Sequence, residues 1–322
     1  MRGADVILTV TPSPTLDWVV FVRHFRLGAV VRAEKELLTP SGKGVDASLV
    51  LHQLGHATLA TGLLAGDNGR LAVALLDQIG VAHDFVWAEG ETRHATVLVD
   101  LELRAQSTIT APTLRASEHH LQMLAAVIGR HLPAARFVIL AGSLPTGWPV
   151  DAYTRLIACC REAGVPTLLD TSGPSLAAVV SADAPAPDII KINLEELSGL
   201  GTRIDAAIDD VARAVATLRA RLGNQAVIVT LGDQGALVAT EATLWYTQPP
   251  RVPVVNTAGA GDALAACVAW GRAIGEDWPG TLRRATAAAA AVVTTEATAH
   301  CEPEEVERLL EQVQVVSVQG SK

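Results

Sequence analysis

One segment of this chain carries more information than any other, and it reads Asn256-Thr257-Ala258-Gly259-Ala260-Gly261-Asp262. The apolar run at 251–255 before it predicts a strand, and the pattern at 263–274 after it predicts a helix. Small residues allow the backbone to approach a ligand closely, and the free N–H groups at the start of a helix bind anions. Asp262 stands at the head of that helix, where a carboxylate can accept a proton from a hydroxyl held beside the anion.

An anion-binding turn next to a base is the combination that phosphoryl transfer requires. By itself, however, the segment also fits an ordinary tight turn in which Asp262 caps the helix. Two other nucleotide-binding loops do not fit. A dinucleotide-binding loop needs a small residue at position 264, where Leu stands, and Ser41-Gly42-Lys43-Gly44 lacks the earlier glycine of a Walker A loop.

The rest of the chain alternates short apolar runs with amphipathic stretches of helical length. Buried strands are predicted at 6–10, 58–63, 137–141, 167–170, 189–192 and 226–230. Helices are predicted between them at 44–54, 118–129, 149–163 and 206–222. This order predicts an α/β fold with a doubly wound, mostly parallel sheet that has helices on both faces.

Two further strand-like runs, at 17–21 and 96–101, have no crossover helix available. They predict a small separate sheet that forms a flap or lid. In the last third we expect a hairpin at 237–239 and 243–246, followed by helices at 261–274 and 280–294. The sequence shows no internal repeat or linker, so we expect the chain to form one domain over 1–322, with lid strands inserted at about 15–40 and 84–112.

Composition excludes several classes of protein. The net charge of −9 argues against binding to nucleic acid or to an anionic membrane, because both need a basic surface. No leader opens the sequence, and no apolar run approaches the roughly 20 residues of a membrane span. The spacing of Cys159, Cys160, Cys267 and Cys301 matches no zinc pattern. We therefore expect a cytoplasmic protein with reduced thiols.

Several other motifs accompany the Asn256–Asp262 segment. They are Pro12-Ser-Pro-Thr-Leu-Asp17, Ser41-Gly-Lys-Gly44, Ala141-Gly-Ser-Leu-Pro145, Leu169-Asp170-Thr-Ser172, Lys191-x-Asn193-x-x-Glu196 and Thr230-Leu-Gly-x-x-Gly235. In type and order they resemble the motifs of the ribokinase-like (PfkB) carbohydrate kinases, and the resemblance covers nearly the whole chain. It is closest to the branch that phosphorylates ketohexose phosphates, which includes 1-phosphofructokinases and tagatose-6-phosphate kinases.

The resemblance implies a role for each motif on the ATP side. Asp262 would be the catalytic base, and the backbone N–H groups of Ala258, Gly259, Ala260 and Gly261 would bind the transferred phosphoryl group. ATP would lie near Lys191, Asn193, Thr230, Gly232 and Gly235. Asn193 and Glu196 would hold Mg²⁺ through water, although their spacing also suits a helix cap.

On the acceptor side, the resemblance implies that Asp17, Gly42 and Asp46 would bind the sugar. Arg32, Lys43 and Arg93 fall where the sugar-phosphate branch places basic groups, and three cations around one phosphate would bind it strongly. A homodimer formed through the lid is also implied, because edges of small sheets often pair between subunits.

Departures from the family pattern gather on the acceptor side. They are Ser13, Ser41, Asp46, Ala95, Thr110 and Cys267. An acidic residue at position 46 is expected to repel a phosphate dianion. The acceptor therefore stays open between a ketohexose phosphate, such as fructose 1-phosphate or tagatose 6-phosphate, and an unphosphorylated sugar or nucleoside. A sensor without catalytic activity is a third hypothesis.

Overall fold

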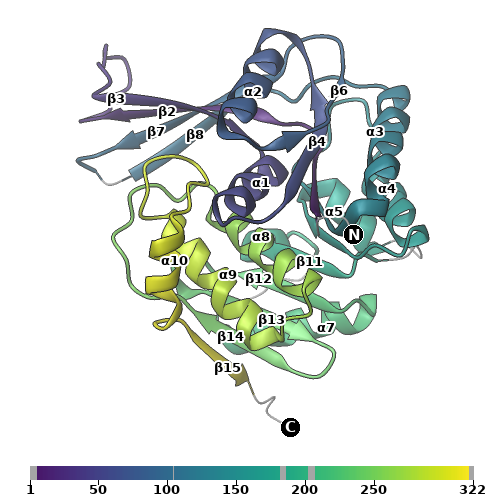
Figure 1. Ribbon diagram of the computed structural model, residues 1–322. Helices are drawn as coiled ribbons and strands as arrows, with labels where there is room; N and C mark the ends of the chain where they lie inside the picture. Colours follow the sequence, from purple (N-terminus) through teal and green to yellow (C-terminus); the bar gives the residue numbers. More distant parts are fainter. Residues whose placement is uncertain (1–5, 104, 182–185, 202–206, 319–322) are drawn as a thin grey trace.

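The computed structural model describes residues 6–103, 105–181, 186–201 and 207–318 (Figure 1). Its strands are β1 (Val6–Thr11), β2 (Thr15–Val22), β3 (Lys35–Ser41), β4 (Thr58–Leu64), β5 (Ala82–His83), β6 (Val86–Trp87), β7 (Arg93–Asp100), β8 (Ala105–Thr110), β9 (Ala135–Ala141), β10 (Thr167–Asp170), β11 (Ile189–Asn193), β12 (Ala226–Thr230), β13 (Ala236–Thr240), β14 (Leu244–Gln248) and β15 (Gln314–Val318). Its helices are α1 (Lys43–Gln53), α2 (Gly66–Ile79), α3 (Glu118–His131), α4 (Ala152–Glu162), α5 (Gly173–Ser181), α6 (Leu194–Ser198), α7 (Ile208–Leu222), α8 (Ala260–Ala273), α9 (Trp278–Val292) and α10 (Pro303–Leu310), with short 3-10 turns at Leu132–Ala134 and Gly232–Gln234.

The large sheet runs in the order β15-β14-β13-β12-β11-β10-β9-β1-β4-β5, and β6 pairs with β4 beside this path. Neighbouring strands from β12 to β5 are parallel, whereas β12 to β15 pair antiparallel. This is the mostly parallel, doubly wound sheet that the sequence predicts. The six predicted buried strands and the predicted hairpin are confirmed.

Both faces of this sheet are covered by helices. Ile7 and Ile139 pack with α1, α8 and α9, whereas their chain neighbours Leu8 and Val138 pack with α3 and α4. A further cluster fills the space between the sheet and α5 and α7. Because successive side chains point to opposite faces and both faces are buried, each central strand reads as a continuous apolar run.

The small sheet projects to one side of the large one, beside α2 (Figure 1), in the order β3-β2-β7-β8. Its register places Thr39, Asp17, Ala95 and Thr110 in one row across the four strands. The next row consists of Leu38, Trp18, Thr96 and Ile109. Asp17 and Ala95 are buried, whereas Trp18, Leu38 and Ile109 are exposed, so one face of this sheet is covered and the other presents apolar side chains to solvent.

One sequence prediction about local structure is wrong. The run at 251–255 does not form a strand, and α8 follows an irregular segment instead. Pro253 has no N–H to donate to a sheet, and β14 is already paired on both sides, with β13 and β15. The Val255 N–H instead donates to the Val293 carbonyl at the end of α9, at 2.8 Å.

The residues selected from the sequence for the ATP side lie at one edge of the large sheet. β10, β11 and β12 end at Asp170, Asn193 and Thr230, and parallel strands place their carboxyl ends on the same edge. Ligands of doubly wound sheets bind at that edge. Within the described ranges, no helix is both long and apolar enough to cross a membrane.

Candidate active site

A buried carboxylate links two lysines at the carboxyl edge of the sheet. Asp170 ends β10, and its Oδ2 accepts a hydrogen bond from Lys191 Nζ at 2.6 Å. Its Oδ1 accepts one from Lys43 Nζ, which reaches over from the first turn of α1. Burial alone would raise the pKa of Asp170, but the two ammonium groups hold that pKa below its usual value. Asp170 therefore carries a negative charge that fixes both lysines in place.

Two glycines, Gly259 before α8 and Gly261 in its first turn, leave little room for a side chain. Gly259 caps the helix with a left-handed φ of 88°, and a Cβ there would lie 2.5 Å from the Ala299 nitrogen. A Cβ on Gly261 would lie 2.7 Å from Lys191 Nζ. The lysine ammonium thus packs directly against the first turn of α8, which adds positive charge where a helix N-terminus already favours an anion.

The backbone N–H groups of this turn differ in whether they already donate a hydrogen bond within the protein. Those of Gly259 and Gly261 form no hydrogen bond with any residue that the structure describes. The Ala258 N–H donates to Asn256 Oδ1 at 2.9 Å, and the Ala260 N–H makes only a long bond of 3.5 Å to the Thr257 carbonyl. The sequence predicts that all four amides bind the phosphoryl group, and this stays a prediction. The Ala258 N–H differs from the others because it already donates to a side chain within the turn.

Asp262 is the third residue of α8 and faces both lysines. Burial raises the pKa of Asp262 to about 6, and the carboxylates of Asp170 and Asp17 act in the same direction, while Lys191 and Lys43 oppose them. A carboxylate with this pKa is ionised at neutral pH and is more basic than an ordinary aspartate. It has the properties of a general base working near neutral pH.

Asn193 and Glu196 form a capping box at the start of α6. Asn193 Oδ1 accepts from the Glu196 N–H at 2.7 Å, and Glu196 Oε2 accepts from the Asn193 N–H at 2.8 Å. The structural role that their spacing suggests is therefore present. The second carboxylate oxygen of Glu196 remains outside the cap and lies 3.7 Å from Lys43 Nζ. Glu196 thus serves the helix with one oxygen and faces the site with the other.

Three other residues predicted to lie near ATP belong to the end of β12 and to the turn beyond it, and they are Thr230, Gly232 and Gly235. Thr230 ends the strand, and its hydroxyl donates to the Ile192 carbonyl at 3.4 Å. Gly232 has no heavy atom within 4 Å of an added Cβ, so its surroundings are open. Gly235, by contrast, packs against the Thr247 carbonyl of β14, which gives it a role in the hairpin.

On the small sheet, the charge of Arg93 acts on the buried carboxyl group of Asp17. Arg93 begins β7, and its guanidinium donates to the Ser13 carbonyl at 3.3 Å and to the Ser143 hydroxyl at 3.4 Å. Burial raises the pKa of Asp17, against the opposing effects of Ser41 and of the Arg93 charge. The Nε of Arg93 and the Oδ1 of Asp17 are both buried without a partner in the described part of the chain.

Asp46 lies beside the row that contains Asp17, in the first turn of α1, four residues after Gly42. Ser41 Oγ lies 3.0 Å from Asp17 Oδ2 and 3.1 Å from Asp46 Oδ2, so one hydroxyl bridges two carboxyl groups. Asp46 is buried, and burial together with the carboxylates of Asp262 and Asp17 raises its pKa well above the usual value. The acceptor side is therefore rich in carboxyl groups.

The three predicted phosphate-binding cations do not lie in one cluster. Lys43 is engaged with Asp170 and Glu196, on the ATP side, and Arg93 lies beside Asp17. Arg32 is exposed in the loop between β2 and β3, and no hydrogen bond or ion pair connects it to any described residue. The structure therefore joins Lys43 and Arg93 to the site and leaves Arg32 at its outside.

Comparison with known proteins identifies the family of the chain. The family model "pfkB family carbohydrate kinase" matches residues 14–305. The chain belongs to the pfkB family of carbohydrate kinases. It is 32% identical over 309 residues to a 1-phosphofructokinase of Vibrio cholerae serotype O1, an alignment that covers 96% of each protein.

Solved structures of phosphofructokinases share the fold. Phosphofructokinase-2 from Escherichia coli, solved in complex with substrates and products, matches with a TM-score of 0.89 and 25% identity over 95% of this chain and 98% of that chain. A putative phosphofructokinase from Staphylococcus aureus matches with a TM-score of 0.79 and 26% identity, over 98% of this chain and all of the other. The prediction of a ribokinase-like fold and of a sugar-directed phosphotransferase is confirmed.

Sequence reasoning missed the residue at the centre of the site. Asp170 lies in one of the motifs that resemble the pfkB family, but it was given no role. The sequence does contain a signal for a functional role of Asp170, because an aspartate is rarely found at the end of an apolar, buried parallel strand, where ligands of such sheets bind. The tertiary structure adds what the sequence does not show, namely the two lysines from α1 and β11 that meet on it.

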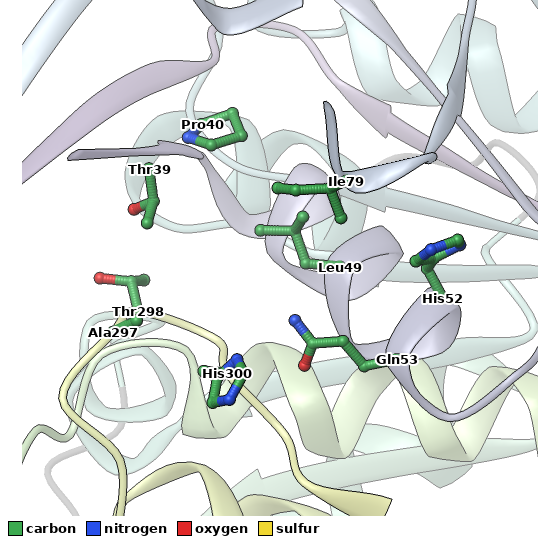
Figure 2. A pocket seen from close by; sticks show the side chains of 9 residues that line it. All are labelled: Thr39, Pro40, Leu49, His52, Gln53, Ile79, Ala297, Thr298 and His300. Carbon is green, nitrogen blue, oxygen red and sulfur yellow. The ribbon is translucent and has the colours of Figure 1, made fainter. Parts of the chain in front are cut away.

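A separate hollow of about 510 Å³ lies between α1, β3 and the loop after α9 (Figure 2). Thr39, Thr298, His52, Gln53 and His300 are among the residues that line it. Thr39 pairs with Asp17 in the small sheet, and the hydroxyl of Thr298 acts to lower the pKa of Asp17. The hollow therefore borders the acceptor side, and none of the site residues selected from the sequence lines it.

Proposed function

We propose that this pfkB-family chain transfers the γ-phosphoryl group of ATP to a hydroxyl of a sugar phosphate, with Asp262 as the base. One observation carries this proposal. The raised-pKa carboxylate of Asp262 lies in the first turn of α8, next to two amide N–H groups without described partners and to the Lys191 ammonium. A proton acceptor and an anion-binding turn are thus within the same few residues.

The chemistry follows from that arrangement. The acceptor oxygen attacks the γ-phosphorus, the bond from that phosphorus to the β–γ bridging oxygen breaks, and ADP departs with the bond electrons. Asp262 takes the proton of the attacking hydroxyl. The N–H groups of Gly259 and Gly261 and the ammonium of Lys191 stabilise charge on the moving phosphoryl group. The open surroundings of Gly232, beside Thr230, support a place for the nucleotide at this edge.

The donor set fits Mg²⁺ that is carried by ATP and largely hydrated. Among the described residues, no group of three His, Cys, Asp or Glu side chains is suited to hold a metal ion directly. Mg²⁺ commonly keeps several waters and takes phosphates together with one or two carboxylates. Glu196, with one oxygen outside its helix cap, would contact such an ion through water, near Asn193. When bound, the ion supplies charge neutralisation on the phosphates.

The acceptor proposal rests on the row Thr39–Asp17–Ala95–Thr110 and on Arg93. The buried Asp17 carboxylate can accept hydrogen bonds from sugar hydroxyls, and the Arg93 guanidinium can bind a phosphate. This favours a ketohexose phosphate such as fructose 1-phosphate or tagatose 6-phosphate. The name of the Vibrio cholerae relative, 1-phosphofructokinase, supports the first of these.

The small sheet is proposed to act as a lid over that sugar. Among the contacts that join it to the body, Lys35 pairs with Glu296, and the Thr257 N–H donates to Gln106 Oε1 at 3.2 Å. Thr257 belongs to the turn that leads into α8, so the position of the lid is coupled to the anion-binding turn. A closed lid would exclude water, which otherwise competes with the sugar as acceptor.

We also propose that two copies of the chain associate through the exposed face of this lid. Trp18, Leu38 and Ile109 form an apolar row there, and such rows are often covered in oligomers. Sedimentation at micromolar concentration should show a dimer, and Trp18→Glu together with Ile109→Glu should convert it to a monomer. A parent protein that sediments only as a monomer would contradict this assembly.

A panel of acceptors tests the activity. With Mg²⁺ and ATP, turnover should be highest with one of the ketohexose phosphates and at least tenfold lower with the corresponding free sugars, because Arg93 loses its phosphate partner. Turnover restricted to free sugars or nucleosides would favour the second hypothesis. Thermal stabilisation by ligands without turnover of any compound would favour the sensor.

A further inference from the structure

The carboxyl groups of Asp17 and Asp46 both contact the hydroxyl of Ser41, and this arrangement bears on the protonation state of the two carboxyl groups. Ser41 Oγ lies within hydrogen-bond distance of both, at 3.0 Å from Asp17 Oδ2 and 3.1 Å from Asp46 Oδ2. All three side chains are buried. A serine hydroxyl has one proton to donate and lone pairs to accept, whereas an ionised carboxylate can only accept.

The serine has a single proton, so it can donate one full hydrogen bond to one of the two carboxyl groups. The other carboxyl group makes a full hydrogen bond only by donating to the serine, for which it needs a proton of its own. If both carboxyl groups were ionised, they would have to share the one serine proton, and a buried charge would be left poorly compensated, which is costly. The geometry therefore favours one proton on the pair at pH values at which a free aspartate is ionised.

The surroundings identify Asp46 as the protonated member. Asp17 faces the Arg93 cation, which favours its ionised form. Asp46 faces two carboxylates, Asp262 on α8 and Asp17 on β2. Burial and these like charges raise the pKa of Asp46 well above its usual value, whereas the hydrogen bonds from Ser41 and the Gly42 backbone oppose that rise only in part.

The other elements packed against α1 do not supply a cation to Asp46. α1 contacts β1, β3, β4, β9 and α8, and neither β1 nor β4 contains an ionisable side chain. Lys43, on α1 itself, pairs with Asp170 and Glu196. The remaining ionisable groups of α1 and of these elements lie away from the first turn of α1. They are Lys35 and Glu36 at the start of β3, Arg136 at the start of β9, His52 in the last turn of α1, and Cys267 and Arg272 further along α8.

We propose that Asp46 is a specificity-determining positioning residue that stays a neutral acid near neutral pH, donating its proton to Ser41, which donates in turn to Asp17. The specificity role of Asp46 rests on the proposed function. The relay Asp46–Ser41–Asp17 orients the Asp17 carboxylate toward the sugar hydroxyls. It also leaves a single negative charge at this position, so that an anionic sugar can bind beside an acidic side chain.

This resolves the conflict expected from the sequence. An ionised Asp46 would repel a phosphate-bearing acceptor, but a neutral one has the hydrogen-bonding groups of a carboxamide with respect to Ser41: one donor and one carbonyl oxygen. An asparagine at this position would present the same groups. The aspartate differs in one respect, because it can lose its proton as the pH rises. Acceptor binding should then become sensitive to alkaline pH.

Steady-state kinetics of the full-length enzyme test the relay. From about pH 6 to pH 10 the acceptor kcat/KM of the parent should fall at the alkaline end, through a rising KM, as Asp46 ionises. Asp46→Asn should remove that fall, because the amide donates at every pH. Asp46→Leu, which has a similar volume and no donor, should raise the acceptor KM at least tenfold throughout. An Asp46→Asn variant that raises the acceptor KM as much as Asp46→Leu would overturn the proposal.

Unfolding experiments test the proton without any activity. If Asp46 holds its proton in the folded state, the parent loses stability relative to Asp46→Asn as the pH rises above the unfolded pKa, and this loss continues until the folded pKa is passed. The difference in unfolding free energy should therefore keep growing above about pH 6. A difference that is constant from about pH 5 upward would show an ionised Asp46 and reject the relay. The result stands whether or not any sugar phosphate is turned over.

Discussion

The two sides of the candidate active site are built differently. The phosphoryl-transfer side consists of Asp262, the turn before α8, Lys191 and Asp170, all on elements of the large sheet and its helices. The acceptor side lies where the small sheet meets α1. The first side retains the motifs that the family resemblance predicts, with Cys267 further along α8 as its one named departure. The second gathers the other departures, since Ala95 and Thr110 stand in the same cross-strand row as Asp17, and Ser41 and Asp46 adjoin it.

This difference shows how one kinase scaffold can keep its chemistry while its acceptor changes. The groups proposed to stabilise the transferred phosphoryl are held by buried ion pairs and close backbone contacts, where few substitutions fit. The groups proposed to bind the sugar stand on a four-stranded sheet, where a row of side chains can change together without disturbing the main core. Changes on the two sides should therefore alter different kinetic constants.

The largest effect is expected at Asp170. Asp170→Asn leaves Lys43 and Lys191 without their shared counter-charge, and breaking a buried ion pair on one side costs about 3–5 kcal/mol. Both the free energy of unfolding and kcat should fall. Denaturant unfolding measures the first, with Asp151→Asn as the control. Asp151 pairs with Arg155 on the surface, and its change should cost less than about 1 kcal/mol. Equal losses in the two variants would remove Asp170 from the centre of the site.

Much of the phosphoryl-transfer side could be predicted from the sequence because it depends on local patterns. A buried parallel strand is a short apolar run, and a glycine turn before a helix can be read within seven residues. The shared role of Asp170 could not be read this way, since Lys43 and Lys191 come from positions 127 and 21 residues away along the chain. The use of the Ala258 N–H by Asn256 depends on a side-chain conformation that sequence patterns do not specify.

The acceptor side was harder to predict for a related reason. The row of Asp17, Ala95 and Thr110 is set by strand register, and a shift of one residue would turn each side chain to the other face. Arg32, Lys43 and Arg93 could be selected as basic residues, but only the fold separates the exposed Arg32 from the other two. The incorrect strand prediction at 251–255 has a similar origin, because its apolar composition suits a strand while β14, the strand before it, is already paired on both sides.

A smaller, selective effect is expected at Arg93. Arg93→Ala removes a cation beside Asp17. KM for a phosphorylated acceptor should rise by roughly 10- to 100-fold, which corresponds to the loss of one charge-assisted hydrogen bond, while KM for ATP should change little. Arg32→Ala is the matched control, since this exposed arginine has no described contact with the site, and its kinetics should match the parent. If Arg32→Ala raised the acceptor KM and Arg93→Ala did not, the phosphate would bind at the outer end of the lid.

The smallest effect is that of mild acid on the parent enzyme. Because burial raises the pKa of Asp262 to about 6, this base is protonated as the pH falls through that value. Activity should therefore be retained above it, fall to about half at the pKa, and then fall about tenfold per pH unit. The pH dependence of kcat/KM for the acceptor measures this. A profile that stays flat down to about pH 4.5 would indicate a base with an ordinary carboxyl pKa.

The central claim concerns Asp262, and one measurement tests it most directly. Single-turnover phosphorylation of the best acceptor by ATP should be compared in the parent and in Asp262→Asn, together with ATP binding and thermal stability. The variant should bind ATP and remain folded, but it should transfer phosphate about 10²- to 10⁴-fold more slowly, because it lacks the proton acceptor. Transfer at the parental rate by a folded Asp262→Asn protein would contradict the account.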